Sequence, residues 1–403
     1  MKQLLAYCLS IILCVSFTGC MENYLDLYPE DKITSASFPE NESDIKLLLN
    51  GVYAQLREKE VYNQGLFGFG ITDGATPNAF NWGTDEVFNK LGAGRLSSSD
   101  GGVVTYRWKR CYEIISRANY LLACMDLVDL SEEAKAKYSG ETHFLRGLAY
   151  SVLAETYGGV PIILTDISTE EARSLKRASL EETWQQALDD YEVAITNLGV
   201  DAPEPGRATK GAALGMKMRA YLYQGKYKEV LSCVEQIDAL KKYGLFHSYE
   251  GLFDPANENN KEVLFDIQYI EGENSQGSYI DQYCGTGTGS WTRGSRYVPT
   301  DDLVAAYETI DGSPVDPENP YENRDPRLGF TAVLPGSYFL GYRFPNYLYP
   351  GGAFNHAGNR LKHLSTRKYR IQDESKLPPS GQSYINDIIL RYADVLLLSL
   401  IHI

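Results

Sequence analysis

The sequence has few residues of the kinds that build metal sites and reactive centres. It contains five histidines and seven cysteines, but no C-x-x-C pair and no histidine-rich spacing, so we expect no bound metal. A G-x-S-x-G elbow, an H-E-x-x-H helix and a phosphate-binding loop are also missing. These absences predict a protein that is not an enzyme and that needs no cofactor.

Positive charge is scarce as well. The chain has 38 lysines and arginines against 53 aspartates and glutamates, which gives a formal net charge of −15 at pH 7. Nucleic acid and anionic bilayers repel such a surface, so we expect neither as a partner. The many acids do not indicate a glycosidase, because that chemistry needs two carboxylates held about 5–9.5 Å apart in a cleft. The sequence singles out no such pair.

Only one long apolar run is present. It extends from Leu4 to Phe17, follows Lys2 and is too short for a membrane span of about 20 residues. Because it leads into Phe17-Thr18-Gly19-Cys20, it is typical of a bacterial lipoprotein signal. We expect residues 1–19 to be removed and the Cys20 thiol to carry a lipid anchor. The alternative is an ordinary secretory signal cut elsewhere, with Cys20 left as a free thiol.

Residues 38–240 are predicted to form long helices, because apolar residues recur there with a 3.6-residue period. Ser131 and Ser179 are predicted caps, and Gly158 is a predicted helix stop. We expect Leu180 and Trp184 on the inward face of one helix. The predicted helices span residues 44–57, 104–126, 131–157, 179–198, 208–224 and 229–240.

The last two predicted helices form a hairpin around the short turn Gly225-Lys226-Tyr227. Small residues such as Gly215 favour close helix packing, and Tyr223 and Tyr227 are predicted to fill the groove. The hairpin resembles a tetratricopeptide repeat unit, whose hairpins stack because none can bury its own face alone.

Beyond residue 243 the sequence becomes rich in glycine, proline and aromatic residues. Residues 262–269 alternate like a strand, and a helix is predicted at residues 387–398. Within that helix we expect Arg391 and Asp394 to pair, because they are i,i+3 neighbours. Long irregular stretches usually serve binding, so residues 243–386 are the predicted ligand-binding region.

Two loops carry candidate sugar-binding groups. Sugar recognition without catalysis needs flat aromatic rings and planar polar groups, and both loops supply them. The first, residues 73–82, contains Asn81 and Trp82. The candidates in the second loop are Asp281, Tyr283, Trp291, Arg293, Arg296 and Tyr297. The alternative is that Trp82 and Trp291 only fill gaps beneath their loops.

Several short segments, in this order, resemble the SusD/RagB family of surface glycan-binding lipoproteins. They are Tyr24-Leu25-Asp26-Leu27-Tyr28-Pro29, Cys111-Tyr112-Glu113-Ile114-Ile115, Phe144-Leu145-Arg146-Gly147-Leu148-Ala149-Tyr150, Tyr157-Gly158-Gly159-Val160-Pro161, Asn260-Lys261-Glu262-Val263-Leu264-Phe265, Asn323-Arg324-Asp325-Pro326-Arg327-Leu328 and Leu390-Arg391-Tyr392-Ala393-Asp394-Val395.

The resemblance implies a mainly α fold, with a stack of tetratricopeptide-like hairpins and a large loop-rich, minor-β ligand platform. It divides the mature chain into a helical region at 20–242, a binding region at 243–386 and the start of a final helix at 387–403, where the chain is predicted to be truncated. The implied function is capture of an oligosaccharide at the outer membrane for a SusC-like TonB-dependent transporter. A tetratricopeptide-like scaffold or peptide-binding lipoprotein is the alternative.

Overall fold

The computed structural model describes residues 38–57, 72–81, 90–97, 99–272, 277–278, 280, 297–344, 364–371, 373–379 and 382–400. The predicted signal peptide and the lipidation site Cys20 lie outside these residues, and they stay predictions. Among the helices of the described part, none combines the length and the apolar character that a bilayer crossing requires.

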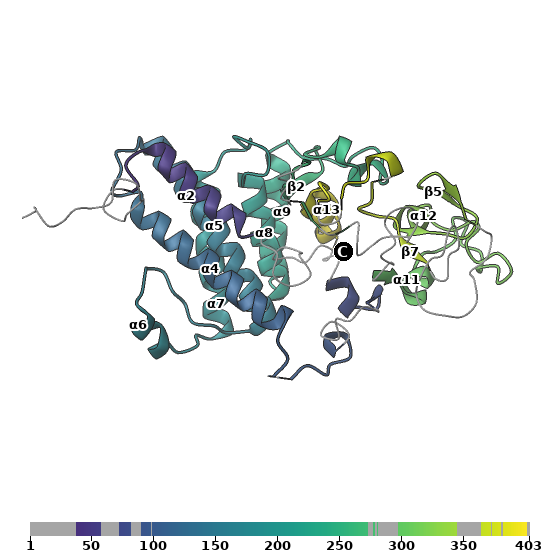
Figure 1. The fold of residues 1–403 in the computed structure, drawn as a ribbon, viewed down its shortest axis with the longest axis horizontal. Helices are drawn as coiled ribbons and strands as arrows, with labels where there is room; N and C mark the ends of the chain where they lie inside the picture. Colours follow the sequence, from purple (N-terminus) through teal and green to yellow (C-terminus); the bar gives the residue numbers. More distant parts are fainter. Residues whose placement is uncertain are drawn as a thin grey trace, which may run out of the picture.

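Helices follow one another through the first half of the chain, and the long ones stand side by side in Figure 1. They are α2 (Glu42–Ala54), α4 (Val103–Cys124), α5 (Glu132–Tyr157), α6 (Thr169–Ser174), α7 (Leu180–Asn197), α8 (Lys210–Tyr223) and α9 (Tyr227–Ala239). Each long helix packs against its neighbours along the chain, α5 between α4 and α7 and α8 between α7 and α9. The predicted helices and their hairpin-like stacking are confirmed.

Local hydrogen bonds explain where these helices begin and end. Ser131 accepts a bond from the amide of Ala134, and Ser179 forms a capping box with Glu182. Such caps satisfy amides that have no partner within the helix, and each contributes about 1 kcal/mol. After α5, Gly158 takes a positive φ of 75°, a conformation that glycine adopts without strain.

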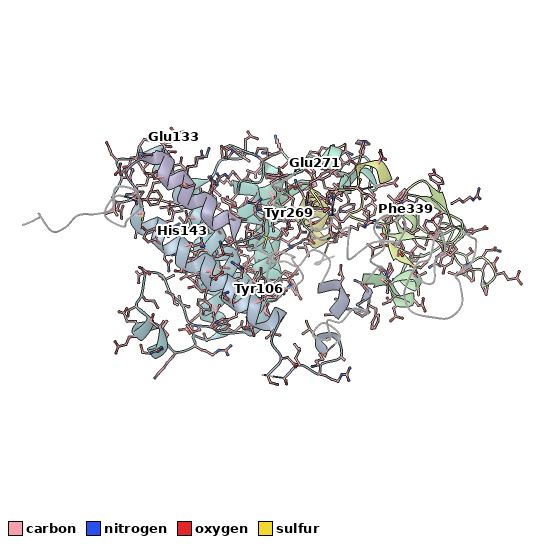
Figure 2. The ribbon with its side chains drawn as sticks, in the orientation of Figure 1. Tyr106, Glu133, His143, Tyr269, Glu271 and Phe339 are labelled. Carbon is pink, nitrogen blue, oxygen red and sulfur yellow. The ribbon has the colours of Figure 1, made fainter. Side chains whose placement is uncertain are left out.

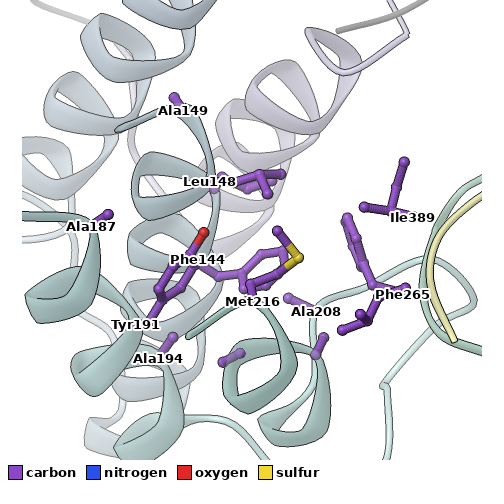
Figure 3. Packing of buried hydrophobic residues seen from close by; sticks show 14 of the residues in the cluster. Phe144, Leu148, Ala149, Ala187, Tyr191, Ala194, Ala208, Met216, Phe265 and Ile389 are labelled. Atoms are coloured by element: carbon purple, nitrogen blue, oxygen red, sulfur yellow. The ribbon is translucent and has the colours of Figure 1, made fainter. Parts of the chain in front are cut away.

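The main core lies between the helices and a strand from the second half of the chain. Figure 3 shows Phe144, Tyr191 and Met216 packed together, with Phe265 beside them. The rings of Phe144 and Phe265 are edge to face, with centroids 4.9 Å apart. This contact joins α5 to the strand that contains Phe265, so the helical stack and the second half share one core.

Gly215 is closely packed, but against a strand and not against a helix as predicted: a Cβ atom there would lie 2.1 Å from Cδ2 of Leu390, in the strand at residues 387–391. Three other expectations for the helices are wrong. Leu180 is 48% exposed, and Tyr223 and Tyr227 are 54% and 51% exposed. All three lie at helix ends, where the neighbouring helix no longer covers the face that the period selects.

The predicted helix at 387–398 is half wrong. Its first part is strand β8 (Asp387–Arg391), which pairs antiparallel with β2 (Val263–Ile267), and only α13 (Tyr392–Ser399) is helical. Arg391 and Asp394 therefore do not pair with each other. Arg391 Nη1 is 2.8 Å from Glu262 Oε1, and Asp394 Oδ2 is 2.9 Å from the Arg219 guanidinium.

The remaining elements are short. They are η1 (Thr72–Ala75), β1 (Ala79–Asn81), η2 (Gly251–Phe253), η3 (Pro255–Asn257), β3 (Tyr297–Pro299), α11 (Asp301–Ala306), α12 (Arg327–Thr331), β4 (Ala332–Val333), β5 (Tyr338–Phe339), β6 (Tyr342–Arg343), β7 (Ser365–Thr366) and η4 (Glu374–Lys376). In Figure 1, α11, α12, β5 and β7 lie at the end of the molecule opposite α2 and α6. β4 pairs with β7 and β5 with β6.

A second, smaller core supports this end of the molecule. It consists of Val333, Phe339, Leu340 and Phe344. In Figure 2, Phe339 marks this small lobe, His143 the helical stack, and Tyr269 and Glu271 lie between the two along the long axis.

Candidate functional site

The two candidate sugar-binding loops meet through a pair of short strands. β1 and β3 are antiparallel, with Ala79 opposite Pro299, Phe80 opposite Val298 and Asn81 opposite Tyr297. Two of the predicted site residues, Asn81 and Tyr297, are thus cross-strand partners although they are far apart in the sequence. The other predicted residues, Trp82, Asp281, Tyr283, Trp291, Arg293 and Arg296, lie outside the described residues. Their place in the site stays a prediction.

Thr300 fastens the two loops to each other. Its amide donates a hydrogen bond to the carbonyl of Asn78 at 3.1 Å, and its hydroxyl donates to the carbonyl of Pro77. The same hydroxyl accepts a bond from the amide of Leu303 at 3.1 Å and so caps α11. One side chain therefore joins the first loop, the end of β3 and the start of α11.

The first loop is also held by its own hydrogen bonds. The hydroxyl of Thr76 donates to the carbonyl of Asp73 at 2.8 Å and accepts a bond from the amide of Asn78 at 3.1 Å. These are the local bonds by which threonine fixes a turn. The chain from η1 to β1 is consequently one braced segment that ends at Asn81.

Phe80 is a candidate that the sequence analysis did not select. It is 43% exposed on β1, whereas its cross-strand partner Val298 is only 5% exposed. A partly exposed aromatic ring in this loop has the apolar face that a sugar needs. Phe80 lies in the same loop as Trp82, so the criterion that selected the Trp82 ring would also have found Phe80.

Hollows elsewhere in the described structure do not involve the predicted residues. One of about 610 Å³ is bounded by α2, the loop at 204–207 and the chain after β2. Another of about 710 Å³ lies along α2 and α4. The described lining of each hollow mixes polar, charged and apolar side chains, and it includes no residue of β1 or β3.

The described residues contain no group of three or more histidine, cysteine, aspartate or glutamate side chains placed to hold a metal. Two acids are nevertheless buried in the β2–β8 pair, Asp266 opposite Ile388 and Asp387 opposite Ile267. Burial raises the pKa of Asp266 to about 6 and the pKa of Asp387 to about 7, and the charge of Asp266 adds to the shift of Asp387. Asn386 donates from Nδ2 to Asp266 at 3.1 Å.

The cysteines that the structure describes are buried. Cys111, Cys124 and Cys233 are free thiols in the core. Burial raises the pKa of Cys233 to about 11 and also raises the pKa of Cys111. A thiol held in its protonated form is a poor nucleophile, so these cysteines serve packing.

Comparison with known proteins agrees with this architecture. Residues 23–222 match the family described as starch-binding associating with outer membrane, and residues 261–399 match the SusD family. A SusD-like protein of Formosa agariphila is 26% identical over 74% of this chain and 58% of its own length. The chain thus spans little more than half the length of that relative.

Solved structures give the same result. A SusD-like carbohydrate-binding protein from Bacteroides fragilis superposes with a TM-score of 0.78 at 27% identity, over 89% of this chain and 73% of that one. A laminarin-binding SusD-like protein has a TM-score of 0.70 at 19% identity, over 89% of this chain and 80% of that one. Fold and sequence together define the class of helical SusD-like proteins. The chain belongs to the SusD/RagB family.

Proposed function

We propose that this protein is a non-catalytic glycan-binding lipoprotein of the outer membrane, which captures an oligosaccharide and passes it to a TonB-dependent transporter. The observation that carries glycan binding is the β1–β3 pair. It brings together the two loops whose composition suits sugar recognition, and it leaves the ring of Phe80 43% exposed beside them. Family membership supports the same function, since relatives in this family are described as carbohydrate binding.

In this proposal Trp82 and Trp291 stack on the rings of the oligosaccharide. Asn81, Arg293, Arg296 and Tyr297 make polar contacts with its hydroxyl groups. A stacked ring contributes roughly 1 kcal/mol, so binding at each site is expected to be weak. Weak binding suits a protein that must release its ligand to a transporter.

Affinity gel electrophoresis tests the proposed glycan binding. Starch and laminarin are cast into native gels, and retardation of the parent protein is compared with that of Trp82→Ala, Trp291→Ala and the double variant. We expect the parent to be retarded by at least one polysaccharide and the double variant to migrate as in a plain gel. The matched control is Tyr227→Ala, which removes a ring that is 51% exposed at the start of α9, outside both loops.

Two results contradict the proposal in different ways. If the double variant is retarded as strongly as the parent, the two tryptophans do not bind the glycan. A parent protein that no polysaccharide retards would favour the alternative, a peptide-binding or scaffold lipoprotein. The lipid anchor is tested separately, because Cys20→Ser should release the protein from the outer-membrane fraction, and co-purification of a TonB-dependent transporter with the anchored form would support delivery.

A further inference from the structure

The second sugar-binding loop follows Ile280 and leads into β3, and the structure describes the chain at both of these ends. At the β3 end, Tyr297 lies opposite Asn81, and Thr300 is hydrogen-bonded to the first loop. At the other end, Ile280 is only 2% exposed and belongs to the main core. The place where the loop begins is therefore set by what holds the chain just before and at Ile280.

The chain before Ile280 is paired with the segment that leads into β8. The amide of Ser278 donates to the carbonyl of Ser383 at 2.7 Å, and the amide of Ser383 donates to the carbonyl of Ser278 at 3.0 Å. These two bonds form an antiparallel bridge outside the named strands. Both serines are only 1% exposed, so pulling them apart would leave buried backbone groups without partners, which is costly.

Gly277 allows the two chains to come this close. A Cβ atom added there would lie 2.4 Å from the Cα and from the carbonyl carbon of Gln382, and 2.8 Å from its carbonyl oxygen. These are backbone atoms, so no side-chain rotation can relieve the overlap. Gly277 does not have a positive φ. Glycine is therefore required here because of the close approach and not because of the backbone conformation.

Asn386 holds the segment that Gly277 approaches. Its side chain is 2% exposed, its Oδ1 accepts a hydrogen bond from the amide of Tyr269 at 2.9 Å, and its Nδ2 donates to Asp266 at 3.1 Å. The amide of Asn386 donates to Glu258 Oε1 at 2.8 Å. The segment before β8 is thus fastened to β2 and to the chain on both sides of it, and it cannot move away from Gly277 without breaking these bonds.

We propose that Gly277 is a positioning residue for glycan binding: by allowing the Ser278–Ser383 bridge, it fixes the point at which the second sugar-binding loop begins. Gly277 is itself buried and is not a ligand contact. It acts through the candidate residues that follow Ile280, of which Asp281 is the first. Its effect on affinity rests on the proposed glycan binding, whereas its effect on the bridge rests on the described contacts alone.

Hydrogen exchange tests the bridge without a ligand. In Gly277→Ala the amides of Ser278 and Ser383 should exchange about tenfold faster than in the parent, because amides that lose their hydrogen bonds also lose protection. The matched control is Ser383→Ala. The hydroxyl of Ser383 has no hydrogen-bond partner among the described residues, so this variant keeps the backbone bridge and its exchange should match the parent. Parent-like exchange in Gly277→Ala would overturn the inference.

Affinity for starch and laminarin separates a positioning role from a merely stabilising one. Gly277→Ala should bind about two- to tenfold more weakly than the parent, because binding must then restore the position of the loop. The control Gly159→Ala creates the same kind of overlap, 2.1 Å from the carbonyl oxygen of Ala178, in the helical half and outside both loops. It should lower the urea midpoint but keep the affinity of the parent. Equal losses of affinity in the two variants, or parent-like affinity in Gly277→Ala, would overturn the inference.

Asn386→Ala covers the case in which Gly277→Ala does not fold. It removes the side-chain bonds to Tyr269 and Asp266, so the amide of Ser383 should exchange faster and affinity should fall in the same direction. Parent-like exchange and affinity in Asn386→Ala would overturn the inference. If the parent itself binds no polysaccharide, the proposed function fails and the positioning role fails with it, whereas the bridge is judged by hydrogen exchange alone.

Discussion

Replacing Thr300 by valine removes one hydroxyl that serves both candidate loops, while the shape of the side chain is kept. The hydroxyl donates to the carbonyl of Pro77 and accepts from the amide of Leu303. Loss of the helix cap costs about 1 kcal/mol, and loss of the hydrogen bond to a carbonyl costs about 0.5–1.5 kcal/mol. We therefore expect Thr300→Val to be about 1.5–2.5 kcal/mol less stable in the region that holds the β1–β3 pair.

Urea unfolding and glycan titration together measure this effect. The midpoint should move to lower urea at an unchanged m-value. Affinity for a retained polysaccharide should decrease, because the first loop keeps only the backbone hydrogen bond from residue 300 and loses the one from the hydroxyl. Thr300→Ser is the control, since it keeps the hydroxyl and should remain near the parent in both assays. Parent-like stability and affinity in Thr300→Val would refute the reasoning that this hydroxyl joins the loops.

Two further predictions concern the junction of the helical stack with the β2–β8 pair. Gly215→Ala should destabilise by about 1–3 kcal/mol in urea unfolding, because the new Cβ would lie 2.1 Å from Cδ2 of the fully buried Leu390. The matched control Gly51→Ala meets only Arg117 Nη1 at 3.5 Å, and it should be neutral or stabilising by about 0.5–1 kcal/mol. A Gly215→Ala protein as stable as the control would contradict the close packing. The second prediction concerns the pH dependence of stability. In the folded state the pKa of Asp266 is raised to about 6 and that of Asp387 to about 7. The folded state therefore binds more protons than the unfolded state between about pH 4 and 7. Stability in metal-free buffer should fall as pH rises across that window, and Asp387→Asn should flatten the fall and be about 1–3 kcal/mol more stable at pH 8. An unchanged pH profile would show that Asp387 does not carry the effect.

Most of the helical half of the fold was predictable because its signals are local. The capping box of Ser179 with Glu182 and the cap of Ser131 lie within a few residues of the helices they start, and the structure confirms both. The hairpin of α8 and α9 follows from one short turn at Gly225, whose φ is 69°. Prediction failed at Leu180, Tyr223 and Tyr227, which lie at helix ends. The sequence of one helix does not tell how far its neighbour extends over such an end.

The strand at 387–391 shows why local signals were not enough in the second half. Ile388, Ile389 and Leu390 form a short apolar run, which periodicity alone cannot distinguish from a buried helix. These residues form a strand because they pair with β2, which lies more than a hundred residues earlier in the chain. Once β8 pairs with β2, Arg391 faces Glu262 instead of Asp394.

The candidate site depends on the same kind of distant pairing. Sequence composition selected both loops, but β1 and β3 are three residues each and carry no strand pattern of their own. Their register is fixed from one end, where Thr300 donates hydrogen bonds to the carbonyls of Asn78 and Pro77 and where the braced turn after Asp73 leads into β1. A substitution that leaves every ring in place but loosens this fastening should therefore weaken binding as surely as removal of a ring, which is why Thr300 tests the site more sharply than its aromatic residues alone.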